Sequence, residues 1–433
     1  MATGIEAATM RKVAWRLIPL VSLCYTINVL DRFNVSVAAL TMNKALGLTA
    51  TTYGLGAGAF FWSYTLFQIP ANSALTRVGA RRWITGIVVF WGLCSMGTAL
   101  ATGVYSFVAA RFMLGVAEAG FFPGVAYFMT CWFPSRYRGR AMGVFYAFGS
   151  SAGILVGPVS ANLLALDGTF GIAGWQWVFL VEGVPTLLLA SFCPFVLRDG
   201  PKDAAWLAAD ERDWLETRLQ SERDAAIGGH LQTTRALISP QLALLTIVYL
   251  LVGFGVYSKG FFLPLILKTF GFTDITVGYL TAVPNAAGVI GMLFFSRRSD
   301  KTGERVWHLT TPLLIGGAGL ILTGIAIGLG SGPLTIAAFG ISAFGISGSL
   351  PVFWNLPTAF LGAAAAASGI AFINSVGNIS GYVAPQFVGL LRDYSGSYQM
   401  PMMVMGGMVA VGGVIVPFAA RLRPRRLPVL QKA

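Results

Sequence analysis

LTRVGARR (residues 75–82) and RSDKTGER (residues 298–305) each separate two long apolar segments of this 433-residue chain. Both stretches carry a basic residue two positions before a glycine. GSSAGILVGP (149–158) in the first half likewise matches GNISGYVAP (377–385) in the second half, with one gap. Because the same landmarks recur in the same order, the sequence predicts two related halves, an architecture typical of transporters.

The composition indicates a protein that lies in a lipid bilayer. Hydrophobic residues make up 55% of the chain and charged residues 11%, whereas soluble domains carry about a quarter charged residues. The net charge of +13 raises the question of a nucleic acid partner. We expect none, because the basic residues lie in short loops between apolar runs and not on a polar domain.

Apolar segments long enough to cross a bilayer recur twelve times, since a spanning helix needs about 20 such residues. The only long hydrophilic stretch follows the sixth segment, and its Ala-, Leu- and Glu-rich core (203–226) predicts a surface helix. We therefore expect an all-α integral membrane protein with twelve transmembrane helices in two pseudo-symmetric six-helix bundles, 1–197 and 241–433, joined by a cytoplasmic linker, 198–240. The predicted helices lie near 13–40, 52–75, 83–101, 104–129, 139–165, 174–196, 241–267, 275–296, 308–328, 333–356, 367–391 and 399–420.

The distribution of Lys and Arg predicts the orientation in the membrane. Of the 30 basic residues, 24 lie at the chain ends or in loops after even-numbered helices. Basic residues collect on the cytoplasmic side of membrane proteins. Both termini are therefore expected in the cytoplasm, with the chain in the inner (plasma) membrane.

The second-half loop Asp300-Lys301-Thr-Gly303 resembles the cytoplasmic loop signature of the major facilitator superfamily, D-R/K-x-G. The first-half copy keeps Arg77 and Gly79 but has Thr76 where Asp is usual. The resemblance implies a gating role for these cytoplasmic loops, with a weaker loop-to-helix charge contact in the first half.

Further stretches along nearly the whole chain are similar to the anion:cation symporters of that superfamily. The resemblance implies a proton-driven importer of sugar acids, of hydroxy-dicarboxylates such as tartrate, or of aromatic carboxylates such as phthalate. It implies no cofactor and a monomer. The stretches are LDRFNVSVA (30–38), RFMLGVAEAGFFPG (111–124), GWQWVFLVEGVP (174–185), FWNLPTAFL (353–361) and GIAFINSVGNISGYVAP (369–385).

Ionisable side chains inside a bilayer are costly and usually functional. Six lie well within the predicted helices, and five of these fall on helices 1, 4 and 7, which line the central cavity of the resembled fold. We expect the sixth, Glu182, to be structural because it lies outside this set. The six are Asp31, Arg32, Arg111, Glu118, Glu182 and Lys259.

Arg111 and Glu118 share one face of helix 4, two turns apart. The resemblance makes Glu118 and Asp31 proton-coupling carboxylates and Arg32 a ligand of the substrate carboxylate, with Arg111 holding Glu118 or the substrate. The planar fork of Arg suits a carboxylate. Structural charge pairs remain the alternative for each of them.

Lys259 is not expected from the family pattern, and a second cavity cation could bind a second carboxylate. The equally weighted alternative is a Lys that extends to the membrane surface. The resemblance adds Tyr64, Trp354 and Asn374 to the substrate site, and Asn378 lies one turn beyond Asn374 on the same face. Packing or an interfacial aromatic belt is the alternative role for the aromatic residues.

Other functional classes have less support in the sequence. There is no Walker A motif for ATP-driven transport, and neither a nucleophile elbow nor a metal-binding constellation for an enzyme. A proton-driven exporter and a non-transporting sensor remain open. The substrate also remains open, since an aromatic acid would need an apolar slot, for which six phenylalanines are candidates: Phe60, Phe61, Phe121, Phe122, Phe261 and Phe262.

Overall fold

The computed structural model describes residues 2–226, 240–357, 369–370 and 372–421, and these residues are almost entirely helical. The first half contains α1 (Ala2–Ala45), α2 (Ala50–Val78), α3 (Ala80–Gly97), α4 (Val104–Glu118), α5 (Phe121–Trp132), α6 (Ser135–Leu164) and α7 (Gly174–Val196). The second half contains α10 (Pro240–Lys268), α11 (Asp274–Thr302), α12 (Val306–Gly328), α13 (Gly332–Phe353), α15 (Ile379–Ser395) and α16 (Gln399–Arg421).

Ten helical segments in the described part of the chain are long and apolar enough to cross a membrane. One of them joins α4 and α5 across a short break (104–132). The helix α2 and the helical segment that ends in α15 complete the predicted set of twelve.

The break between α4 and α5 differs from the single helix predicted there. Pro123 has no N–H to donate to the carbonyl of Ala119, so the chain lacks one helical hydrogen bond at this point. The indole Nε1 of Trp83 donates to the neighbouring carbonyl of Gly120 at 3.3 Å. The break lies directly after Glu118.

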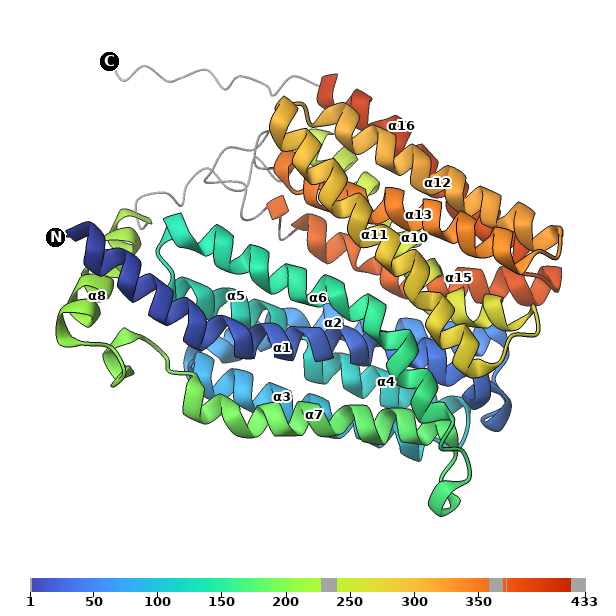
Figure 1. Ribbon diagram of the computed structural model, residues 1–433, viewed down its shortest axis with the longest axis horizontal. Coiled ribbons are helices and arrows are strands. Elements are labelled where there is room, and N and C mark those ends of the chain that lie inside the picture. The colour runs from blue at the N-terminus through green and yellow to red at the C-terminus, as the bar shows by residue number, and fades with distance from the viewer. Residues whose placement is uncertain (1, 227–239, 358–368, 371, 422–433) are drawn as a thin grey trace.

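The helices form two bundles that lie side by side (Figure 1). In the first bundle α1 packs on α6 and α7, α2 on α4, and α3 on α7. In the second bundle α12 packs on α13 and α16, and α11 on α13. The bundles meet along three helix pairs, α2 with α15, α6 with α11, and α1 with α10.

The contacts between the bundles include close approaches at the ends of the helices farthest from the start of α1, here called the distal end. A Cβ at Gly54 would overlap the carbonyl oxygen of Pro385, and one at Gly157 would overlap the α11 backbone. Thr51 donates from its N–H and its hydroxyl to Asp393 at 2.8 and 2.7 Å. Glycine is needed at the two crossings because only a missing side chain lets the backbones come this close.

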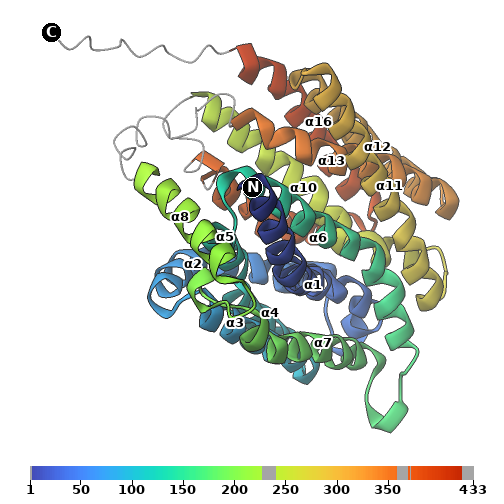
Figure 2. The same cartoon turned by 60° about the vertical axis from the view of Figure 1, so that its left-hand side comes forward.

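The predicted linker helix is present as α8 (Ala209–Ala226), which lies beside the start of α1 (Figure 2). Glu211 pairs with Lys12 of α1 at 2.6 Å, and Glu222 accepts from the N–H and hydroxyl of Ser135 at 2.9 and 3.0 Å. The linker helix is therefore attached to the first bundle. The exact domain boundaries, 1–197 and 241–433, stay a prediction.

Candidate functional site

The ion pair between Arg32 on α1 and Glu118 on α4 is the centre of the candidate site. Nη2 of Arg32 donates to Oε2 of Glu118 at 2.9 Å and to Oδ1 of Asn28 at 3.3 Å. The Glu118 side chain is fully buried, whereas 17% of the Arg32 side chain is exposed. The helix break after Glu118 sets the end of α4 at this pair. Arg32 is thus the member of the pair that an incoming anion can reach.

An aromatic wall surrounds the Arg32 guanidinium, and we use this name for Phe60, Phe61, Tyr64 and Tyr257. The guanidinium carbon lies 4.9, 5.8 and 5.1 Å from the ring centroids of Phe60, Phe61 and Tyr64, all on α2. Tyr257 of α10 packs on Phe61 at 4.5 Å between ring centroids. Ring faces attract a cation at these distances. Through Tyr257, the second bundle therefore contributes to the site around Arg32 of the first bundle.

Arg111 on α4 is fully buried next to this pair. Its Nη2 donates to the carbonyl of Arg32 at 3.2 Å, and its guanidinium carbon lies 5.3 Å from the ring centroid of Phe60. Its Nε and Nη1 donate to no group in the described part of the chain. Buried, unpartnered donors of a charged group cost free energy, so an anion that reached them would be stabilised.

Asp31 points away from Arg32, into the interior of the first bundle. Its carboxylate accepts from the indole of Trp91 at 2.8 Å and from the hydroxyls of Ser95 and Thr186 at 3.1 and 3.3 Å. Adjacent helical residues point about 100° apart, which separates the two side chains. Asp31 therefore lies among α1, α3 and α7, behind the pair and not in contact with it.

Lys259 on α10 contacts the neighbouring helix α11. Its Nζ donates to Oδ1 of Asn285 at 2.8 Å. The amide of Asn285 in turn donates to the carbonyl of Gly153 on α6 at 2.7 Å. Lys259 and Tyr257 are two residues apart and so project from different faces of α10. Lys259 thus belongs to a contact between the bundles, and its role toward a substrate stays a prediction.

Three predicted substrate residues lie in the second bundle, away from the described contacts of Arg32. Trp354 follows α13 and packs on Tyr249 at 4.9 Å between ring centroids. Asn374 and Asn378 are half-buried, and Asn378 directly precedes α15. None of the three makes a hydrogen bond, ion pair or ring contact with Arg32 in the described part of the chain.

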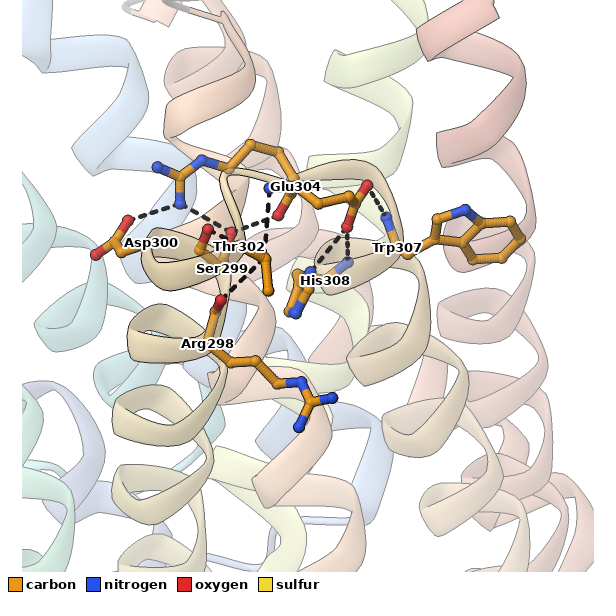
Figure 3. A network of polar contacts seen from close by, with 8 residues as sticks. Arg298, Ser299, Asp300, Thr302, Glu304, Trp307 and His308 are labelled. Carbon is orange, nitrogen blue, oxygen red and sulfur yellow. Dashed lines mark hydrogen bonds and ion pairs between the residues drawn. The ribbon is translucent and has the colours of Figure 1, made fainter.

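The predicted loop residue Asp300 belongs to a polar network around the α11–α12 connection (Figure 3). Nη1 of Arg305 donates to Asp300 at 2.6 Å and to the hydroxyl of Ser299 at 2.8 Å. The Glu304 carboxylate caps α12 and lies 2.8 Å from Nδ1 of His308. Burial alone would raise the pKa of Glu304, but hydrogen bonds from α12 outweigh it and keep this pKa below its usual range. The network fixes the turn between the two helices.

The glycines of the two repeated loops have positive φ, 89° at Gly79 and 69° at Gly303, where other residues are strained. The predicted loop residues Arg77 and Lys301 are exposed. In the first half, Asp199 binds the start of α3. Its carboxylate accepts from the backbone N–H of Arg81, the second residue of α3, at 2.9 Å. The carboxylate missing at position 76 is thus supplied by a residue 123 positions later in the chain.

The structure also brings polar residues to these sites that the sequence analysis did not select. Asn28 lies one turn before Arg32 on α1, and a search at helical spacing could have found it. Asn34 lies three residues after Asp31 and is equally accessible to such a search. No sequence pattern would have singled out Asn285.

The six candidate phenylalanines for an aromatic slot do not lie together. Phe60 and Phe61 belong to the aromatic wall, and Phe261 lies 6.1 Å from Phe61 between ring centroids. Phe121 packs on Trp91 and Phe122 on Tyr25, both inside the first bundle. Phe262 contacts Tyr53 and Tyr398. Three of the six are therefore placed near Arg32.

Comparisons with known proteins agree with this architecture. A family model described as Major Facilitator Superfamily matches residues 21–385. A protein of Agrobacterium vitis named "Putative tartrate transporter" is 39% identical over 98% of this chain and 94% of its own. An Acinetobacter baumannii protein named "Quinolone resistance transporter" is 40% identical over 90% of both chains.

Solved structures show the same fold at low sequence identity. The crystal structure of a bacterial homolog of the human lysosomal transporter Spinster matches with a TM-score of 0.78 at 18% identity, over 94% of this chain and 97% of that chain. The predicted fold of two six-helix bundles is thereby confirmed.

Proposed function

Because the chain belongs to the Major Facilitator Superfamily and is a multi-pass membrane transporter, not an enzyme, we propose that it imports a small organic anion together with protons. The favoured substrates are hydroxy-dicarboxylates and sugar acids, such as tartrate or galactonate. The observation that carries the proposal is the 2.9 Å pair between Arg32 and a fully buried Glu118.

The pair couples an anion to a proton by competition. A substrate carboxylate that binds Arg32 takes the place of Glu118, with the unpartnered nitrogens of Arg111 as further donors. Glu118 is then a buried carboxylate without its cation, a state that costs several kcal/mol. Uptake of a proton by Glu118 removes this cost, so anion and proton bind together. Release of the anion lets Glu118 return to Arg32 and lose its proton.

In this proposal the two bundles, 1–197 and 241–433, rock about the site and open it alternately to each side of the membrane. Both termini and the linker 198–240 lie in the cytoplasm of a monomer in the inner membrane. Support comes from the close crossings at the distal end and from the basic residues of the even-numbered loops.

Lys259 supports a substrate with two carboxylates if the second one replaces Asn285 as its partner. The aromatic wall favours a second candidate, an aromatic carboxylate such as phthalate, because ring faces already flank Arg32 at 4.9–5.8 Å. Both candidate substrates present a carboxylate to Arg32. The hydroxy acids would need hydrogen-bonding partners for their hydroxyl groups, and the aromatic acid would need apolar rings around it.

Uptake of labelled tartrate, galactonate, glucarate and phthalate into proteoliposomes, with and without an inward proton gradient, tests the proposal. We expect gradient-driven accumulation of at least one of them, lost in Glu118→Gln and Asp31→Asn. A labelled quinolone tests export in the same vesicles. Transport of the quinolone alone, or accumulation of an organic acid that ignores the gradient, would refute proton-coupled anion import.

A further inference from the structure

A second polar cluster lies inside the first bundle and is not used by the exchange at Arg32. It contains the carboxyl groups of Asp31 on α1 and Glu182 on α7, with Asn34 between them. The three residues expose 0%, 5% and 0% of their surface. Nδ2 of Asn34 donates to Glu182 at 3.0 Å and lies 3.4 Å from Asp31. One amide group therefore joins two buried acids.

All hydrogen-bond donors to this acid pair are neutral. The donors to Asp31 besides Asn34 are one indole and two hydroxyls from α3 and α7. Glu182 accepts from Asn34 and from the hydroxyl of Ser160 on α6 at 2.6 Å. Among the described residues no Lys or Arg nitrogen lies within 4.0 Å of either carboxyl group. The titratable group that faces Glu182 from a packed helix is Asp31.

The buried charges of the first bundle do not balance if every acid is ionised. Asp31, Glu118 and Glu182 would carry three negative charges, and Arg32 and Arg111 carry two positive ones. Arg32 already serves Glu118. A second ionised carboxylate beside Asp31, without a cation, would cost several kcal/mol in this interior. One bound proton removes the imbalance.

The cluster also contains an acceptor for such a proton. The hydroxyl of Ser160 lies 2.6 Å from Oε1 of Glu182, and a hydroxyl can accept a hydrogen bond as well as donate one. A proton on Oε1 of Glu182 would therefore be held by Ser160, while the amide of Asn34 keeps its N–H contacts with both acids.

The donors distinguish the two acids. Asp31 accepts from four donors, and one of them, the N–H of Trp91 at 2.8 Å, can only donate. Glu182 accepts from only two donors, and one of them is the Ser160 hydroxyl, which can become an acceptor. The donor set thus favours an ionised Asp31 and a neutral Glu182.

We propose that Glu182 is a proton-binding site of this protein and holds one proton when the Arg32 site is empty of substrate. The inference reverses the structural role that the sequence analysis gave to Glu182. Binding of this proton stands on the cluster itself. Its participation in transport rests on the proposed function, since Asp31 and Arg32 are neighbours in α1 and an anion at Arg32 would change the charge near the pair.

Infrared spectroscopy of the full-length protein in lipid tests the proton directly, without any substrate. A protonated buried carboxyl group gives a C=O band distinct from that of a carboxylate. At neutral pH we expect this band in the wild type, its complete loss in Glu182→Gln, and its return in Glu182→Asp. Glu211→Gln is the matched control, because it removes a carboxylate that is paired with Lys12 outside this cluster and should leave the band in place.

Glu182→Gln decides between the two acids, because it removes the proposed proton site and leaves Asp31 in place. A band lost in Asp31→Asn and kept in Glu182→Gln would place the proton on Asp31 and overturn the proposal, as would a wild type without the band. The pH dependence of uptake is a second measurement. We expect Glu182→Gln to change the pH profile of uptake and Glu182→Asp to restore it. Failure of all four labelled acids to be transported would refute the proposed function and leave the infrared result standing.

Discussion

Replacing Arg32 by Met removes the cation that faces the fully buried Glu118. The 2.9 Å separation corresponds to about 6 kcal/mol of Coulomb attraction at an effective dielectric constant of about 20. Desolvation of both groups consumes part of this energy. Breaking a buried pair from one side typically costs about 3–5 kcal/mol, because it leaves an uncompensated charge. We therefore expect Arg32→Met to destabilise the protein by about 3 kcal/mol or more.

A double-mutant cycle separates the pair from the two residues themselves. Glu118→Gln removes the charge that Arg32→Met leaves behind, so the double variant should be less destabilised than the sum of the single variants. The coupling free energy should be about 3 kcal/mol. Reversible unfolding in mixed detergent micelles, followed by intrinsic fluorescence, measures all four proteins.

The pair between Lys12 and Glu211 provides the internal control. It is shorter, at 2.6 Å, but 52% of the Lys12 side chain is exposed. Water and salt screen such pairs, so the same cycle with Lys12→Met and Glu211→Gln should give about 0–1 kcal/mol. Equal coupling energies for the two pairs, or a coupling below about 1 kcal/mol for Arg32 and Glu118, would show that burial does not govern the site.

Three further perturbations follow from the structure. Lys259→Met removes a charge-assisted donor worth about 1.5–3 kcal/mol. Uptake of tartrate, which has two carboxylates, should therefore fall about tenfold or more relative to uptake of galactonate, which has one. An equal loss for both acids would show that Lys259 does not recognise a second carboxylate. Gly54→Leu puts a side chain against the Pro385 carbonyl and should push α2 and α15 apart. A disulfide between Thr51→Cys and Asp393→Cys should then form inefficiently. Unchanged disulfide formation would show that this crossing tolerates a side chain. The hydrogen bond from Lys12 lowers the pKa of Glu211, so docking of α8 on the first bundle should be constant above about pH 5 and weaken as the pH falls below about 4. A fluorescent probe at Ser221 measures this docking. The same decline in a Glu211→Gln variant would show that Glu211 is not the group that titrates.

The membrane fold follows from the sequence because it depends on local properties. Twelve apolar segments are visible as runs of letters, and each must form a helix to satisfy its own backbone in lipid. The repeated loops show the two halves for the same reason, since Gly79 and Gly303 are required locally by a positive φ. The break after Glu118 is not visible in the sequence, because prolines also occur inside unbroken helices such as α2 and α6.

The cost of charge in a bilayer also made the ionisable residues visible, but not their partners. A buried Asp or Arg is conspicuous in an apolar run, so Asp31, Arg32, Arg111 and Glu118 could be selected from the sequence. Which acid meets which base depends on how helices far apart in the chain rotate and pack. Arg32 and Glu118 are separated by 86 positions, and nothing in either stretch specifies their contact.

The tertiary structure alone decided several of the polar contacts. Asn285 links Lys259 to α6, and Asp199 serves the loop that lacks its own acid. The amide of Asn34 contacts both Asp31 and Glu182, although Glu182 lies 148 positions after Asn34 in the chain. Sequence determines which segments enter the membrane because hydropathy is a property of each segment. Only packing determines which polar groups meet there, because a hydrogen bond needs two atoms within about 3 Å.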